Sequence, residues 1–352
     1  MKPKNILTNW ATAAISMATI VLASSCNSIF EDSNCNTSNN LIKLTYDYNL
    51  KKADAFDSEV EYVTLLAFDS KTGKLARRID ATHSQLTSNN EIRLQVNPGS
   101  YDILVWAGEY PDHFDIATGE TGVSTLEDFH CYLHRDANSM VDDRLNLFHG
   151  MKHVELPYAT EGKPNRTTVN LKKNTNAVRI VLQHLSGDPV VADDFEFTIT
   201  DGNGWLNHDN TIRDTSPITY RPHFTHSGSV DINTNPTRPP GTTYSTTQAL
   251  LPSRAVLGAS LAEFAVSRLM MDNNPILTIT NKKENRTVLQ IPINEYALLV
   301  KGYEYADLSD QEYLDRQDQY NMTFFLDESG HWIKANIIIN NWHIIRNEGP
   351  AS

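Results

Sequence analysis

Residues 91–108, Glu-Ile-Arg-Leu-Gln-Val-Asn-Pro-Gly-Ser-Tyr-Asp-Ile-Leu-Val-Trp-Ala-Gly, contain two runs of alternating apolar and polar side chains on either side of a turn. Ile92, Leu94 and Val96 share one face of the first run, and the odd-numbered residues from Tyr101 to Ala107 share one face of the second. A period of two is typical of β-strands that place one face on a core. Because Asn97-Pro98-Gly99 is a turn sequence, we expect two strands joined by a tight turn.

The same alternation recurs in Val178–Leu182 and Phe195–Ile199. Leu65-Leu66-Ala67-Phe68 is apolar on both faces, which favours a central strand. Polar turn sequences such as Asp327-Glu328-Ser329-Gly330 separate the runs, and strands do not alternate with helices as they do around a parallel sheet. The sequence therefore predicts a mainly β protein built from antiparallel β-sandwiches.

Two short helices are predicted as insertions between the strands. Ser124-x-x-Glu127 and Ser309-x-x-Glu312 both have the spacing of a capping box. The first predicts a helix that carries Leu126, Phe129 and Leu133, and the second predicts a short helix over residues 310–318.

The N-terminal segment, residues 1–25, has the order of a secretory signal. Lys2 and Lys4 are followed by an apolar run from residue 11 to residue 23, and then by Ser24-Ser25-Cys26. The run is shorter than the ~20 residues that cross a bilayer as a helix. A cysteine after small residues predicts a bacterial lipoprotein, in which Cys26 carries the covalent lipid. The alternative is an ordinary cleaved signal with a coincidental cysteine.

Length and charge limit the domain count and the class of partner. The chain has 352 residues, and the 327 that follow residue 25 fit two domains. A polar stretch over residues 171–176 suggests a boundary, so we expect a spacer over 26–40, an N-terminal domain over 41–172 and a C-terminal domain over 173–352. The formal charge is −13, and residues 1–25 contribute two lysines and no acid. A charge near −15 on the remainder argues against nucleic acid as a partner.

Cys35 and Cys131 remain if Cys26 is lipidated. In an oxidising compartment they either form a disulfide or stay as two unrelated thiols. A disulfide would tie the acylated N-terminus to the first domain.

No motif for catalysis or for metal binding emerges. His130 and His134 would share a face of the first predicted helix, but no Glu stands between them in the manner of a zinc motif. Asp201-Gly202-Asn203-Gly204-Trp205 resembles half a calcium loop without its other acidic ligands, so a β-turn is favoured. Glycine-flanked serine and phosphate-binding motifs are also absent from the sequence. We therefore expect a protein that is not an enzyme and that carries neither a metal nor another cofactor.

Several segments together carry a resemblance to one family. They are Cys26 to Cys35, Tyr46-Asp47-Tyr48-Asn49, Phe68-Asp69-x-x-x-Gly73, Tyr101 to Gly108, Leu171 to Asn176, Gln311 to Arg316 and Ile337-Ile338-Ile339-Asn340-Asn341-Trp342. In this order the chain resembles the FimB/Mfa2 family of fimbrial anchor subunits of Bacteroidales. The resemblance implies two tandem transthyretin-like domains and an outer-membrane, surface-exposed lipoprotein at the base of a pilus. It also implies fimbrial shaft or accessory pilin subunits as partners, Cys26 as the acylated residue and Cys35 as a second early cysteine.

Strand addition at a sheet edge is a mechanism by which such a protein could attach to a neighbouring subunit, because an edge strand offers unpaired backbone groups to a partner strand. We expect either the first strand, Leu41–Tyr48, or the last, Lys334–Ile345, to meet the neighbouring subunit by strand exchange. The alternative for the last strand is that it only completes its own sandwich. A different function, the binding of glycans or nutrients, would require tryptophans such as Trp106, Trp205 and Trp332 on one exposed face.

Overall fold

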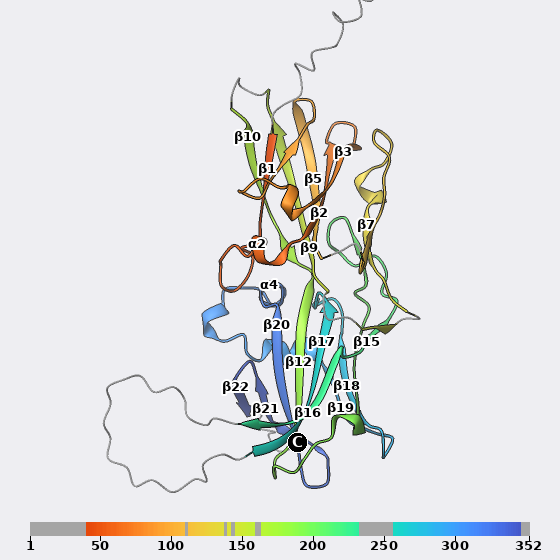
Figure 1. The fold of residues 1–352 in the computed structure, drawn as a ribbon, viewed down its shortest axis with the longest axis vertical. Helices are drawn as coiled ribbons and strands as arrows, with labels where there is room; N and C mark the ends of the chain where they lie inside the picture. Colours follow the sequence, from red (N-terminus) through yellow and green to blue (C-terminus); the bar gives the residue numbers. More distant parts are fainter. Residues whose placement is uncertain are drawn as a thin grey trace, which may run out of the picture.

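The computed structural model describes residues 40–109, 112–136, 139–141, 145–158, 163–231 and 256–345. They form two lobes stacked along one long axis, with β1 in the upper lobe and β22 in the lower one (Figure 1). The chain is mainly β, as predicted, and its helices are short. Cys26, Cys35 and the loop over residues 233–247 lie outside the described residues.

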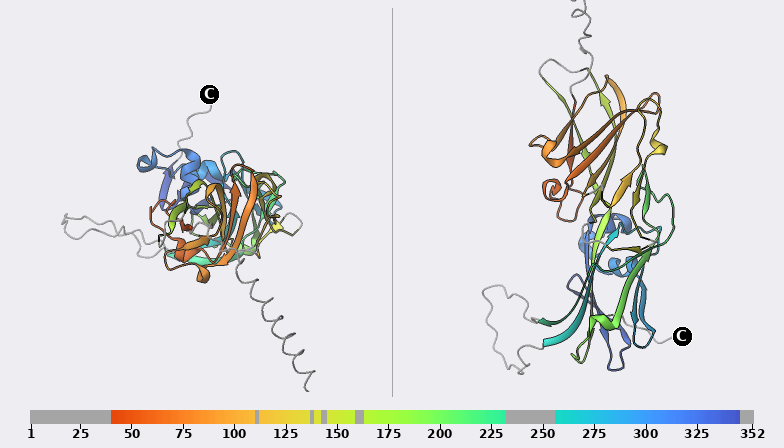
Figure 2. Two further views of the ribbon diagram at one scale, coloured as in Figure 1. Left: turned by 90° about the horizontal axis from the view of Figure 1, so that it is seen from above. Right: turned by 45° about the vertical axis from the view of Figure 1, so that its right-hand side comes forward.

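The upper lobe contains a cover sheet, a central sheet and a bridging sheet, seen from another side in Figure 2. The cover sheet has the order β10 (Asn165–Asn170), β1 (Asn40–Thr45), β4 (Glu91–Leu94). The central sheet has the order β11 (Lys172–Lys173), β9 (Leu147–Leu156), β5 (Gly99–Gly108), β2 (Tyr62–Asp69), β3 (Lys74–Thr82). The bridging sheet has the order β14 (Trp205–Asn207), β7 (His130–Leu133), β6 (Phe114–Ile116).

The lower lobe is a sandwich of a six-stranded sheet and a five-stranded opposing sheet. The six-stranded sheet has the order β16 (Phe224–Asp231), β17 (Val256–Ser267), β12 (Thr175–His184), β20 (Gln319–Leu326), β21 (Trp332–Ile339), β22 (Trp342–Ile345). The opposing sheet has the order β19 (Arg286–Pro292), β18 (Ile276–Asn281), β13 (Phe195–Asp201), β15 (Ile218–Tyr220), β8 (Ser139–Met140).

The prediction of purely antiparallel sheets is wrong, because three strand pairs are parallel. They are β1 with β10, β12 with β20 and β15 with β8. Antiparallel strands separate the members of each pair along the chain, so no strand–helix–strand pattern marks them. Both lobes therefore contain mixed sheets.

β2, inside the central sheet, is buried on both faces, as the doubly apolar Leu65–Phe68 run predicted. Leu65 and Ala67 pack in one core beneath the cover sheet, and Leu66 and Phe68 pack in a second core beneath the bridging sheet. All four side chains are fully buried. This second core is continuous with that of the lower lobe.

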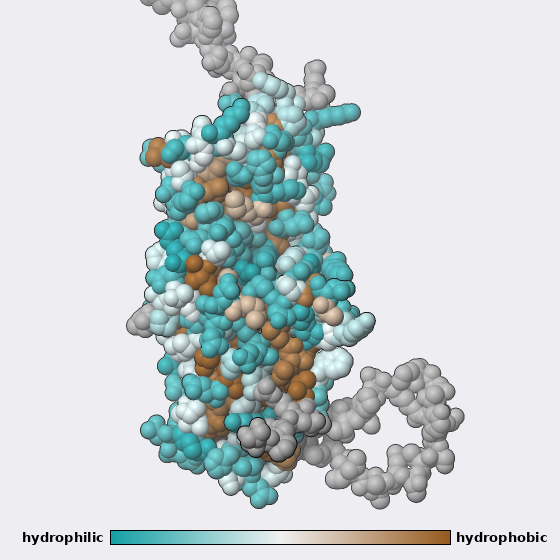
Figure 3. Space-filling view, turned by 180° about the vertical axis from the view of Figure 1, so that it is seen from behind, coloured by the Kyte–Doolittle hydropathy of each residue, from teal (hydrophilic) through white to brown (hydrophobic). Residues whose placement is uncertain are grey.

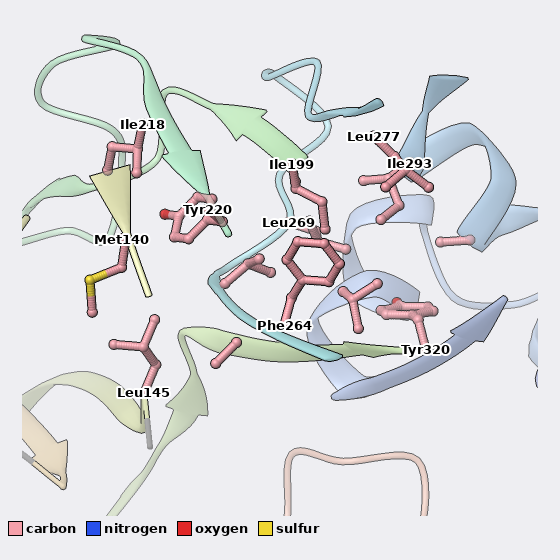
Figure 4. Close-up of a cluster of buried hydrophobic side chains, with 14 of the residues drawn as sticks. Met140, Leu145, Ile199, Ile218, Tyr220, Phe264, Leu269, Leu277, Ile293 and Tyr320 are labelled. Carbon is pink, nitrogen blue, oxygen red and sulfur yellow. The ribbon is translucent and has the colours of Figure 1, made fainter. Parts of the chain in front are cut away.

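Residues from both halves of the chain share the second core. Met140 and Leu145 precede the predicted boundary, yet they lie in the same cluster as Ile218, Tyr220 and Phe264 (Figure 4). Short strands also pair across the predicted boundary, since β14 pairs with β7 and β15 pairs with β8. The lobes are thus interlocked by reciprocal strand pairing.

The two predicted helices had different outcomes. The second is confirmed: α4 spans Asp310–Arg316, and the Ser309 hydroxyl accepts a hydrogen bond from the Glu312 amide at 3.1 Å. The first is wrong, because a 3-10 turn over Leu126–Asp128 leads directly into β7. Phe129, Cys131 and Leu133 are buried at every second position, so the strand period prevails over the capping signal.

The remaining helices are α2 (Phe56–Glu59), α3 (Ile293–Leu298) and 3-10 turns over His83–Gln85, Ala192–Asp194 and Tyr303–Tyr305. None of the described helices has the length and apolar content to span a bilayer.

Candidate interaction surface

The first strand does not offer a free edge. β1 is the middle strand of the cover sheet, where β10 pairs with Asn40–Thr45 on one side and β4 pairs with Asn40–Lys43 on the other. The expectation that Leu41–Tyr48 meets a neighbouring subunit by its edge is therefore wrong, because the chain itself pairs both edges of β1.

The last strand is an edge strand. β21 and β22 form a hairpin whose two turn residues, Asn340 and Asn341, have φ values of 46° and 69°. Positive φ at both positions is typical of the type I′ turn that suits a two-residue hairpin. β22 pairs with β21 alone among the described strands, so its outer backbone edge is free within them. The Lys334–Ile345 segment thus completes its own sheet and also ends it.

An exposed aromatic residue marks this edge. Trp342 lies opposite Ile339 in the hairpin, and Ile344 lies opposite Ile337. Opposite residues of an antiparallel pair point to the same face, and both partners are fully buried in the core. Trp342 therefore points to the core side of the sheet, yet it is 67% exposed. No strand of the described residues therefore covers the core side of β22.

A groove of about 690 Å³ opens in the same lobe, between β19 and the start of β21. Its lining combines apolar Val288, Tyr296 and Trp332 with charged Glu295 and Lys334. The Trp332 ring packs between Phe324 and Tyr296, at centroid distances of 5.9 and 6.3 Å. Its indole N–H is buried and has no acceptor among the described residues. The space-filling view from behind shows a mostly hydrophilic surface with separate apolar patches, broader on this lobe (Figure 3).

The junction between the lobes contains a buried ion pair, Asp315 with Arg268. Asp315 of α4 binds the Arg268 guanidinium through two hydrogen bonds, at 2.6 and 2.9 Å, and contacts Lys172 at 2.7 Å. Burial raises the pKa of Asp315, but the hydrogen bonds and charges of Arg268 and Lys172 outweigh it, so the pKa lies below its usual value. The Arg316 guanidinium stacks 4.0 Å from the Tyr48 ring centroid of the upper lobe.

Further contacts close the junction around this ion cluster. Lys173 pairs with Glu59 at 2.6 Å, and the Asn174 and Asn210 amides bond to each other at 2.6 and 3.0 Å. His149 contacts the His208 carbonyl oxygen through Nε2 at 2.7 Å. Burial lowers the pKa of His149 to about 4, so the ring is neutral at pH 7 and donates this bond. A closed junction fixes the groove relative to the upper lobe.

The other residues singled out in the sequence do not converge on a site. Cys131 lies in the core, 1% exposed, and has no disulfide partner among the described residues; burial raises the pKa of its thiol far above the usual value. His130 lies on β7, so the helical face that it would share with His134 does not exist. Asp201 is buried at the end of β13, where Asn273 donates to its Oδ1 at 2.9 Å. The described residues contain no group of three or more metal-binding side chains.

The three tryptophans of the glycan hypothesis also lie apart. Trp106 is fully buried in the central sheet, Trp205 belongs to the bridging sheet and Trp332 to the groove. The Trp205 ring is covered by the Arg213 guanidinium at 5.6 Å. They do not share one exposed face. Sequence reasoning did not single out Trp342, which is 67% exposed, because nothing within a few residues of it reports where the facing sheet ends.

Comparisons with known proteins give a consistent result. The family model of fimbrillin-A associated anchor proteins Mfa1 and Mfa2 matches residues 31–348. A candidate polysaccharide-binding protein of Bacteroides thetaiotaomicron is 29% identical, with a TM-score of 0.72 over 88% of this chain and 99% of its own. A candidate adhesin of that species is 27% identical, with a TM-score of 0.74 over 89% and 99%. The fimbrial anchor protein Mfa2 of Porphyromonas gingivalis, at 18% identity, shares the fold with a TM-score of 0.64 over 88% and 100%. No curated protein matches the sequence.

Proposed function

The chain belongs to the family of fimbrillin-A associated anchor proteins, and from that premise we propose that it anchors a fimbria to the outer membrane as a surface-exposed lipoprotein. The family is one of non-enzymatic cell-surface proteins. The observation that carries the proposal is the match over residues 31–348, which spans both lobes. Within it, β1, the first described strand, lies in the upper lobe, while β22, whose outer edge no described strand pairs with, lies in the lower lobe (Figure 1).

The attachment to the membrane is the lipid on Cys26. Residues 26–40 are the spacer, and the two domains, 41–172 and 173–352, are both of transthyretin-like type. A pull on the fibre then passes from the C-terminal domain through the junction to the lipid. The ion cluster around Asp315 supports this path of force, because separating its members would leave a buried charge without its partner.

The attachment to the fibre is strand exchange between the C-terminal domain and a shaft or accessory pilin subunit. Its edge lies at β22, since β1 is already paired on both sides. Occupation of this edge by one subunit ends growth at the base, which is how the protein limits fibre length. Edge strands supply backbone hydrogen bonds for affinity, and side-chain pockets supply specificity.

A cysteine pair tests the membrane half of the proposal. A Cys26→Ala variant is expected in the soluble fraction together with its fibres, because the single lipid site is lost. The Cys35→Ala variant is the matched control and is expected to stay with the membrane. Retention of Cys26→Ala in the membrane fraction, or fibres that stay attached to cells without the protein, would contradict the proposal.

The unsubstituted protein from the same strain tests the proposed disulfide between Cys35 and Cys131. Denatured protein is alkylated with and without reduction, and its mass is compared. A disulfide predicts two further alkyl groups after reduction, whereas two free thiols predict none. The second result would also agree with the burial of Cys131 in the core.

A further inference from the structure

The opposing sheet stops one strand short of the six-stranded sheet that it faces. β19 is its last strand and lies across the groove from Trp332 and Lys334 of β21. β22 continues the six-stranded sheet beyond β21, and no described strand of the opposing sheet covers it. This explains why Trp342 is 67% exposed although it points to the core side. The sandwich has room for one more strand at this position.

The free edge of β19 has the features of a strand acceptor. Among the described residues, the backbone of Thr287–Pro292 pairs with β18 and with no other strand. An unpaired edge is a template for another strand. The register shifts at Ile279, which leaves Val288 as a bulge, and Pro292 ends the strand. Bulges and prolines discourage indiscriminate pairing along an edge, so the edge suits one short strand rather than a growing sheet.

We propose that β19 and the groove accept an extended segment of a fimbrial subunit. Its backbone pairs with Thr287–Pro292, and its apolar side chains cover Trp342 and Ile344. Six residues correspond to about 20 Å of strand, which one short segment fills. This inference rests on the proposed function, from which it takes the identity of the partner, and it adds an acceptor site at β19 to the edge already proposed at β22.

The groove defines the chemistry of that segment. Val288, Tyr296 and Trp332 offer an apolar surface, so residues at alternate positions of the segment are apolar. Glu295 and Lys334 flank this surface and favour polar groups of opposite charge at the ends of the segment. The segment is therefore an amphipathic strand.

Photo-crosslinking in fimbriated cells tests the site directly. A photoreactive amino acid replaces Gln290, which is exposed on β19 and lines the groove, in the full-length lipidated protein. The matched control position is Thr225, exposed on β16 at the opposite edge of the six-stranded sheet. We expect a product with a fimbrial subunit, identified by mass spectrometry, from position 290 and none from position 225. A product with a second copy, or only with residues 346–352 of the same chain, would overturn the inference.

A charge introduced at Trp342, on the uncovered core side of β22, tests whether this surface is needed for fibre attachment. Trp342→Asp is compared with Phe224→Asp, because Phe224 is 45% exposed on the opposite edge strand. We expect Trp342→Asp to release about tenfold more fibre into the medium, as for loss of one strong interface contact, while the protein stays in the membrane. Fibre retention equal to that of Phe224→Asp would overturn the inference. The Cys26→Ala experiment distinguishes the two failures, because it reports on anchoring whichever surface binds the fibre.

Discussion

The two lobes treat their sheet faces differently. In the upper lobe β2 of the central sheet is covered on both sides, and Leu65 and Leu66, adjacent in sequence, are both fully buried in different cores. In the lower lobe the six-stranded sheet extends past its opposing sheet, so that Trp342 is exposed on a face where its neighbours are buried. Natural proteins usually cover or shorten such edges. The core side of β22, which no strand of the described residues covers, is therefore the surface that we propose for a partner.

The junction belongs to the closed part of this comparison. It combines a buried carboxylate, two cations and a pair of amides, all with partners. Such groups are tolerated in an interior only when they are paired. The contrast predicts that substitutions at the junction lower the stability of the fold. Substitutions at the uncovered core side of β22 around Trp342, the open flank, are predicted to weaken binding instead.

The largest expected effect is at the junction. Asp315→Asn removes the negative charge and leaves the buried Arg268 guanidinium without a counter-charge, since the Asp315 side chain is 2% and the Arg268 side chain 8% exposed. Lys172 also loses its partner, but its side chain is 31% exposed to water. We expect the free energy of unfolding to fall by about 3–5 kcal/mol, measured by urea denaturation.

Glu312→Gln is the control for this variant, because it removes a charge from the same helix. Its i,i+4 pair with Arg316 is partly exposed, at 32% for the Glu312 side chain, and is expected to contribute about 0.5 kcal/mol or less. Equal losses from the two variants would show that the junction is no more closed than an ordinary surface.

The next effect is a dependence of stability on pH that arises at His149. The pKa of this histidine is about 4 in the folded chain and about 6.5 in the unfolded chain. Between these values the unfolded chain binds a proton that the native chain excludes, so stability is lost as the pH falls from 6.5 to 4. The difference corresponds to about 3 kcal/mol.

His149→Gln isolates this contribution, because glutamine can donate to the His208 carbonyl without titrating. The stability difference between wild type and variant is expected to shift by that amount between pH 7 and pH 4. His153→Gln on the same strand is the control, since His153 is exposed and pairs with Asp102 at 2.8 Å. A parallel pH profile for wild type and His149→Gln would contradict the burial of the ring.

The sequence predicted the parts of this comparison that depend on a local period. The alternation in β5, β12 and β13 and the doubly apolar run of β2 report which faces are buried, because side chains of a strand point to alternating sides. The Ser309 cap likewise depends on neighbours only three residues apart. These features were found because their cause lies within a few residues.

The features that sequence reasoning missed depend on distant partners. β6, β14 and β15 have three residues each, too few for a period to be detected. Arg268 and Asp315 are 47 positions apart, and charged residues are expected at the surface unless a partner is known. The exposure of Trp342 could not be predicted from its neighbours in sequence, because it depends on where the opposing sheet ends, at β19.

The smallest expected effect on stability is at Trp342, and it tests the open flank most directly. Trp342→Ala is compared with Ile339→Ala, which lies directly opposite in the hairpin and is fully buried. The isoleucine variant is expected to lose about 2–5 kcal/mol of unfolding free energy. The tryptophan variant is expected to lose less than about 1 kcal/mol, because most of its surface is already in water. A loss at Trp342 as large as that at Ile339 would mean that the chain itself covers β22, and then the flank could not receive a strand from a fimbrial subunit without first releasing its own.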